Sequence, residues 1–221
     1  MQYFKISSSA AGLAFLAACS TTTPTIPDVP TVGVASNSGG TYAIVTDGAT
    51  HTMTGPSSSL SGNMLAWYGG SASATMKGAG FETADVLALS AMNIAGPNET
   101  FAGISGTLGT VPTSGTATYD TNIRMQLLEP TQVHMFGLPG MSITADFGAA
   151  TVAGTGNYNT AVQGNIVGSQ FTGTASIKGL VNSTVTTVPM QGGFYGTNGG
   201  TIAGVFAGPG LAGVFGGHVV P

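Results

Sequence analysis

The chain has 221 residues, enough for one domain with a small appendage, and only 5% of them are charged. Glycine fills 36 positions and threonine is abundant, so coiled coils and helical bundles are excluded because both residue types weaken helices. Four Lys and Arg residues and a formal net charge of −4 exclude a nucleic-acid-binding surface. A single cysteine excludes a disulfide framework and any metal site built from several cysteines. The composition predicts a β-protein made outside the cytosol.

Residues 1–18 have the features of a lipoprotein signal peptide. Lys5 supplies the positive charge, and the apolar stretch that follows it is shorter than the roughly 20 residues that a membrane span needs. Leu16-Ala17-Ala18-Cys19 matches the lipobox of bacterial lipoproteins. We therefore predict cleavage between Ala18 and Cys19 and lipidation of Cys19, whose acyl chains would hold the protein on a membrane. The alternative is a plain secretory signal with an incidental cysteine.

Residues 19–40 are predicted to form a disordered tether. Pro24, Pro27 and Pro30 lie among Thr, Ser and Gly, and such a segment cannot bury enough surface to fold. The residue after Cys19 is Ser20. An aspartate at this position would resemble the inner-membrane retention signal of enterobacterial lipoproteins. We therefore expect a protein anchored by lipid to the outer membrane, either exposed on the cell surface or facing the periplasm.

Residues 41–98 are predicted to form a small β-rich appendage. Met64 to Tyr68 is typical of a strand that ends in the Gly69-Gly70 turn, whereas Glu82 to Asn93 fits a strand or a short helix. Trp67 and Tyr68 have large aromatic side chains of the kind that binding hot spots favour. We single them out as candidate partner contacts; the alternative is that both cover the barrel predicted below.

The second half of the chain alternates apolar and polar residues with a period of two. In Gly115 to Leu127, for example, Tyr119, Ile123 and Met125 fall on one face. Similar runs follow, Asn198-Gly199 is a strong hairpin signal, and an Ala-Gly-Val-Phe unit occurs at residues 203–206 and again at 212–215. With further strands expected at 101–111 and 152–158, residues 99–221 predict an eight-stranded antiparallel up-and-down barrel. Scattered aromatic residues favour a tethered barrel filled by its own side chains over a membrane-spanning one.

The segment from Gly192 to Phe206 resembles the penultimate hairpin of the transferrin-binding protein B barrel family, which has a Gly-Phe-Tyr-Gly segment, a short loop and Gly-x-Phe. Residues 143–148, 152–154 and 171–175 resemble other strands of that family, so the likeness extends over 101–220. We give a structural role to the hairpin residues Gly193, Phe194, Tyr195, Gly196, Gly204 and Phe206. Phe194, Tyr195 and Phe206 are expected to fill or cap the barrel lumen. The alternative is a hairpin pattern common to many barrels.

The resemblance implies a surface lipoprotein that binds a host protein or a solute, as family members bind transferrin or complement factor H. This chain has one barrel rather than two lobes, so no specific ligand follows. His51, His134 and His218 are the only histidines, and no catalytic triad motif or paired catalytic carboxylates are visible. We expect no enzymatic activity, no metal and no cofactor.

The sequence therefore predicts a non-catalytic, monomeric lipoprotein that binds an unidentified protein or solute through its loops and appendage. Besides the Trp67-Tyr68 pair, Val133 to Met141 with its Pro139-Gly140 turn has apolar surface available for a partner. The alternative function is that of a structural envelope lipoprotein without a specific ligand.

Overall fold

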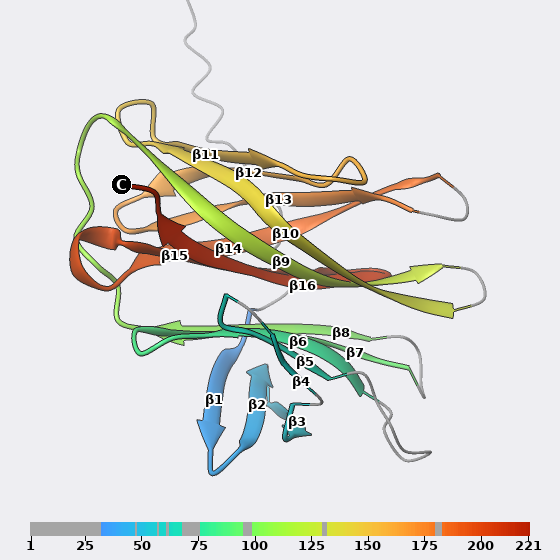
Figure 1. Ribbon diagram of the computed structural model, residues 1–221. Helices are drawn as coiled ribbons and strands as arrows, with labels where there is room; N and C mark the ends of the chain where they lie inside the picture. The colour runs from blue at the N-terminus through green and yellow to red at the C-terminus, as the bar shows by residue number, and fades with distance from the viewer. Residues whose placement is uncertain are drawn as a thin grey trace, which may run out of the picture.

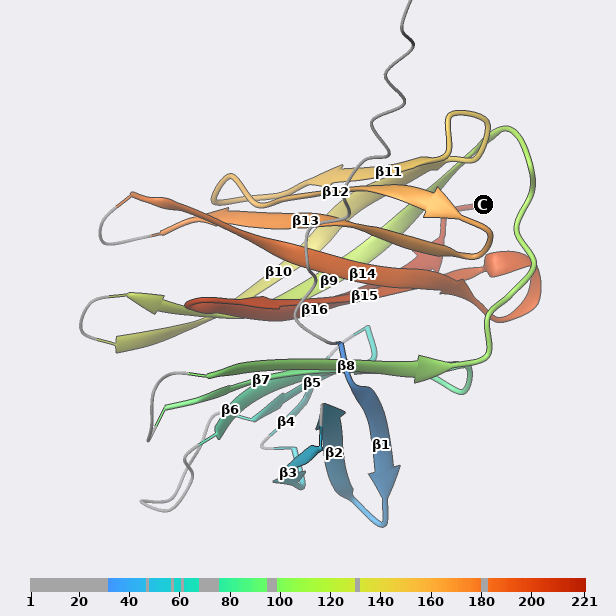
Figure 2. The same ribbon diagram turned by 180° about the vertical axis from the view of Figure 1, so that it is seen from behind.

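The computed structural model describes residues 32–46, 48–56, 58–60, 62–67, 76–94, 99–129, 132–179 and 183–221. The predicted signal peptide, Cys19 and Tyr68 lie outside these residues. The described strands form three stacked layers, which are a closed barrel, a five-stranded sheet and a three-stranded sheet (Figure 1). The same stacking is visible from behind (Figure 2). The chain is all-β, as predicted.

The barrel occupies the C-terminal half of the chain. Its strands are β9 (Thr116–Glu129), β10 (Gln132–Asp146), β11 (Thr151–Thr155), β12 (Ala161–Val167), β13 (Gln170–Lys178), β14 (Val185–Tyr195), β15 (Thr201–Gly208) and β16 (Leu211–Val219). Each strand pairs antiparallel with the next, and β16 pairs with β9 to close the barrel. A short 3₁₀ turn, η1 (Thr197–Gly199), connects β14 to β15 at the predicted hairpin. The predicted eight-stranded up-and-down barrel is confirmed.

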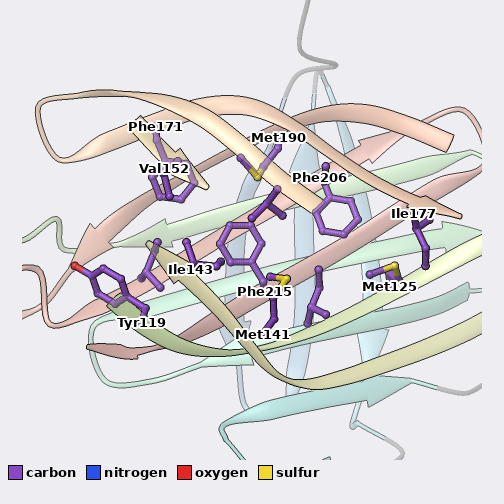
Figure 3. Close-up of a cluster of buried hydrophobic side chains, with 14 of the residues drawn as sticks. Tyr119, Met125, Met141, Ile143, Val152, Phe171, Ile177, Met190, Phe206 and Phe215 are labelled. Carbon is purple, nitrogen blue, oxygen red and sulfur yellow. The ribbon is translucent and has the colours of Figure 1, made fainter. Parts of the chain in front are cut away.

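Large apolar side chains fill the barrel lumen (Figure 3). Phe194 is fully buried and lies 5.4 to 5.8 Å, between ring centroids, from Tyr119, Phe147 and Phe171. The outward side chains of β11 to β13 are instead mostly Thr, Gln and Asn. This arrangement is the reverse of a transmembrane barrel, whose outer face carries the apolar band.

Glycines on β15 and β16 accept the rings of phenylalanines on the neighbouring strand. The two Ala-Gly-Val-Phe units pair antiparallel, so that Gly204 faces Phe215 and Phe206 faces Gly213. A Cβ atom at either glycine would overlap the facing ring. The repeat therefore packs against itself, with each phenylalanine lying over the bare backbone of the other unit.

The five-stranded sheet precedes the barrel in the chain. It contains β4 (Ser58–Leu60), β5 (Met64–Trp67), β6 (Met76–Glu82), β7 (Val86–Asn93) and β8 (Thr100–Gly106), in that spatial order. The strand predicted at 64–68 is confirmed for residues 64–67, and most of the ambiguous segment 82–93 forms β7 rather than a helix. The prediction that residues 101–111 form a strand of the barrel is wrong. It forms β8, at the edge of this sheet, because its side chains pack on both neighbouring layers.

The five-stranded sheet packs on the outside of β15 and β16. Small side chains that point away from the lumen are buried there, among them Ala203, Val205, Ala212 and Val214. Ser90 of β7 donates a hydrogen bond of 3.3 Å to Oε1 of Gln126 of β9, and both side chains are buried. The polar outer face expected for every barrel strand is therefore absent from β15 and β16, because a second layer covers them.

Tyr195 was expected in or over the lumen but lies in this layer between barrel and sheet. Its neighbour Phe194 points into the lumen, so the alternation of a strand turns Tyr195 outward. Burial raises the pKa of Tyr195 to about 12. The residue thus stabilises the attachment of the sheet rather than the barrel interior.

The three-stranded sheet covers the other face of the five-stranded sheet. It consists of β1 (Val34–Ser38), β2 (Thr41–Thr46) and β3 (Ala49–Thr54). The tether was predicted to extend to residue 40, but β1 begins at Val34. The segment is ordered because Ala35 is buried and the backbone of Gly33 bonds to Ala102 and Ile104 of β8.

Candidate functional site

Trp67 does not offer a surface to a partner. Its side chain is 5% exposed and meets the ring of Tyr42 edge-on, with the centroids 5.1 Å apart. It lies in the core between the five-stranded and three-stranded sheets, so it is neither an exposed contact nor a cover for the barrel. The Tyr42 hydroxyl donates a 2.8 Å hydrogen bond to Glu82. Burial, with a smaller contribution from Glu82, raises the pKa of Tyr42 to about 12.

The hairpin residues of the family-like motif occupy structural positions. Phe194 and Phe206 are in the lumen, as expected, and Tyr195 is in the layer outside it. Gly204 lies beneath the Phe215 ring. Gly196 has a φ of +69° where the chain leaves β14, which a residue with a Cβ rarely adopts. Gly193 is packed closely by Leu108 and the Ser169 backbone.

Several connections meet at one end of the molecule, which we call the loop end. It comprises the ends of β7, β9, β11, β13 and β15 and the beginnings of the strands that follow them, together with residues 156–160 between β11 and β12 (Figure 1). The hydroxyl of Thr100, at the start of β8, donates a 2.9 Å hydrogen bond to the carbonyl of Gly208, which holds the two layers together at this end. Tyr158 and Val185 are 52% and 57% exposed at the loop end.

The mouth of the barrel at the loop end carries a pair of ionisable groups. Glu129 at the end of β9 is 3% exposed, and His134 of β10 lies with its Nε2 atom 3.0 Å from Glu129 Oε2. Both residues fall in the inward-facing register of their strands, since His134 pairs with the lumen residue Leu127. The pair therefore closes the apolar lumen with a polar contact.

Aromatic rings continue from this pair across the mouth. The His134 ring is 6.0 Å from Phe136, and Phe136 is 5.9 Å from Tyr158 in the connection after β11. The Tyr158 carbonyl accepts a hydrogen bond of 3.1 Å from the Lys178 amide. Tyr158 has a φ of +55°, which is unusual for a residue with a Cβ and is fixed here by its contacts on both sides. We call His134, Phe136 and Tyr158 the aromatic row.

Sequence reasoning found part of this site. Val133 to Met141 was singled out, and Val133, His134 and Met135 are indeed partly exposed at the loop end. The turn predicted at Pro139-Gly140 is wrong, because β10 continues through it. The register shifts there and Gly140 has a φ of +71°, which identifies a β-bulge. Tyr158 was missed; its signal is an aromatic residue between Asn157 and Asn159 in a turn.

The histidines occupy three separate environments. His51 stacks on Phe101, His134 contacts Glu129, and His218 lies 3.2 Å from the Thr201 hydroxyl. Within the described ranges, no three His, Cys, Asp or Glu residues come together as a metal site would require. No helix in the described part of the chain has the length and hydropathy to cross a membrane. Within the aromatic row Phe136 is buried and Tyr158 is 52% exposed, so the surface of the row is provided mainly by Tyr158.

The architecture defines a class of all-β protein, in which an eight-stranded barrel filled by its own side chains carries an additional sheet on its outer face. Residues 111–218 match the family described as the C-lobe and N-lobe β-barrels of transferrin-binding protein B. The match covers just under half of the chain and extends from β9 into β16, so the barrel is similar to the barrels of transferrin-binding protein B.

Solved structures agree on the fold. A point mutant of transferrin-binding protein B from Haemophilus parasuis Hp5 superposes with a TM-score of 0.53 at 18% identity, over 85% of this chain and 42% of the other. Isotype 1 transferrin-binding protein B from serogroup B Neisseria meningitidis gives a TM-score of 0.53 at 15% identity, over 81% and 39%. The chain thus spans about two fifths of the length of these proteins. No curated protein sequence matches it.

Proposed function

We propose that the chain is a non-catalytic lipoprotein, held on the outer membrane by Cys19 and exposed on the cell surface, that binds a protein partner at the loop end. The aromatic row is the observation that carries the proposal. Its supporting context is the barrel family, in which solved proteins are named for binding transferrin. Transferrin itself is not carried over, because the identity is low and the chain spans only part of those proteins.

Tyr158 has the properties of a binding hot spot. Tyrosine is one of the residue types that most often dominate interface energies. Its backbone is held by Lys178 and its ring by Phe136, so little conformational freedom remains to be lost on binding. The free outer wall of β11 to β13 consists mostly of Thr, Gln and Asn and lacks such an anchor.

A matched pair of variants in the full chain tests the site. We expect Tyr158→Ala to weaken capture of the partner at least tenfold, about 1.4 kcal/mol. Val167→Ala is the control, since Val167 is 78% exposed at the opposite end of the barrel and should leave binding unchanged. The readout is pull-down from serum or host-cell extract followed by binding titration, with purified transferrin as the first probe. Equal binding by both variants would contradict the loop-end site.

The full chain is required for this experiment. A fragment of residues 99–221 would lack β4 to β7, and Val205 and Val214 on the outside of the barrel would become exposed. Loss of binding by such a fragment would therefore report misfolding as readily as loss of a contact.

The membrane anchor has its own test. Cys19→Ser should abolish incorporation of a palmitate analogue and release the protein from the membrane fraction, because the thiol is the attachment point. The 12 residues between Cys19 and Val32 can span at most roughly 45 Å, so an anchored chain would stay near the membrane surface. Label that persists on the variant would overturn the lipoprotein proposal without affecting the binding proposal.

A further inference from the structure

Strand β3 is an edge without a partner strand among the described residues. It pairs with β2 on one side only, and β2 is the central strand of its sheet. The edge of β8 differs, because the backbone of Gly33 bonds to Ala102 and Ile104 there. Natural proteins usually protect an edge with lysine, proline, a bulge or an inward charge. The six residues of β3, Ala-Thr-His-Thr-Met-Thr, include none of these.

The hydrogen-bonding direction of each β3 residue follows from the pairing with β2. The Gly55 amide donates to the Gly40 carbonyl just beyond the ladder. Because direction alternates along an antiparallel strand, Met53 and His51 also bond towards β2. The amides and carbonyls of Thr50, Thr52 and Thr54 therefore point to the open edge. The side chains of all three threonines are exposed.

We propose, in place of the monomer predicted from the sequence, that a second copy of this chain pairs with β3 across this edge. Two β3 strands would run antiparallel about a two-fold axis at Thr52, so that Thr52 faces Thr52 of the other copy and Thr50 faces Thr54. The two three-stranded sheets would then form one continuous six-stranded sheet. This association is independent of partner binding at the loop end.

The edge is self-complementary, which favours a second copy over an unrelated strand. A two-fold contact places the same surface on both sides, so an edge with charged residues would bring like charges together. Here every outward-bonding residue is threonine, and cross-strand threonine pairs are favourable. The three-stranded sheet lies on the face of the molecule opposite the barrel (Figures 1 and 2).

The contact is small, so we expect weak association in dilute solution. Proteins held on one membrane surface meet at a much higher effective concentration. The contact is therefore best measured with the full chain in intact cells or on liposomes.

Cysteine cross-linking tests the register directly. Residues that face each other in a hydrogen-bonded antiparallel pair have Cα atoms about 5.5 Å apart, which a disulfide can bridge. Under mild oxidation Thr52→Cys should give a covalent dimer. Thr50→Cys and Thr54→Cys should each remain largely monomeric alone but cross-link when the two variants are co-expressed. The parent chain controls for Cys19.

A second pair of variants tests the backbone contact. Thr52→Pro removes the outward amide but no bond to β2, so the fold should persist while the dimer population falls at least tenfold. Thr52→Val keeps the amide and should retain the dimer. Far-UV circular dichroism and the melting temperature check that both variants are folded. The proposal would be overturned if Thr52→Cys gave no more covalent dimer than Thr50→Cys or Thr54→Cys alone. The proposal would also be overturned if no homodimer were detected and Thr52→Pro lost partner capture. That result would mean that a strand of the partner pairs with β3.

Discussion

The two faces of β15 and β16 bury apolar residues of different size. Towards the lumen the strands present Ile202, Phe206, Leu211 and Phe215, and the glycines opposite them are bare. Towards the five-stranded sheet they present alanine and valine, and Gly216 lies against the Phe81 ring of β6. Both faces are buried, but the lumen face carries large side chains and the outer face carries small ones.

The difference follows from what each face must do. A closed barrel leaves a lumen that only large side chains can fill, whereas the small side chains on the outer face of β15 and β16 leave room for larger side chains of the covering layer, such as Phe81. We therefore expect the lumen to be sensitive to lost volume and the layer between barrel and sheet to be sensitive to added volume. Substitutions on the two faces can test this contrast.

The largest effect should come from emptying the lumen. Phe194→Ala or Phe206→Ala should lower the free energy of unfolding by roughly 3–5 kcal/mol, because each leaves a cavity that neighbouring strands cannot close. Thr174→Ala on the outer wall is the control and should change it by about 0.5 kcal/mol or less. Urea denaturation of the three variants measures this. Similar losses at all three positions would mean that the inward and outward faces are assigned wrongly.

The buried tyrosines should make the protein sensitive to alkali. Burial raises the pKa of Tyr119 in the lumen and of Tyr195 in the layer to about 12, from 10.0 in the unfolded chain. Between these values the folded state holds a proton that the unfolded state has lost, so stability falls as pH rises. Each tyrosine should contribute a loss of roughly 2–3 kcal/mol between pH 10 and 12. Tyr119→Phe and Tyr195→Phe should each flatten this slope in alkaline denaturation curves, and an unchanged slope in the double variant would refute the assignment.

A smaller effect is expected from filling the layer between barrel and sheet. Gly216→Ala should cost about 1–3 kcal/mol because the new methyl group would overlap the Phe81 ring. Adding Phe81→Leu should recover part of this loss, which a double-mutant cycle would detect. Gly148→Ala is the matched control, since a Cβ there meets only the Asp146 side chain at 3.4 Å. If Gly216→Ala lowered the free energy of unfolding no more than Gly148→Ala does, the layer between barrel and sheet would not be restricted to small residues at this position.

Much of the barrel could be predicted because alternation and glycine spacing are local signals. The lumen positions of Phe194 and Phe206 follow directly from them. The same alternation could not show that the outer face of β15 and β16 is dry. A run such as Ala-Gly-Val-Phe is equally compatible with a strand that has one solvent-exposed face, and the covering layer comes from β6 to β8, which precede β15 by about 100 positions or more. For this reason β8 was assigned to the barrel and Tyr195 to the lumen.

The candidate site was only partly predictable for a similar reason. His134 and Phe136 lie in a segment noted for its apolar residues, but their meeting with Tyr158 depends on the barrel curvature. Trp67 illustrates the opposite error. Its size suggested a contact surface, but size alone also favours burial, and the three-stranded sheet that covers it begins inside the predicted tether.

Closure of the barrel by its first and last strands has a consequence for how the protein matures. During synthesis β16 emerges after the other described strands, and until then β9 has an open edge and the five-stranded sheet an uncovered apolar face. A chain cut short before Leu211 would keep both exposed, and such surfaces are what aggregate in incompletely folded proteins. One hairpin thus closes the barrel and covers the sheet in a single step. Proteases and chaperones could therefore distinguish finished from unfinished molecules by whether β15 and β16 have docked.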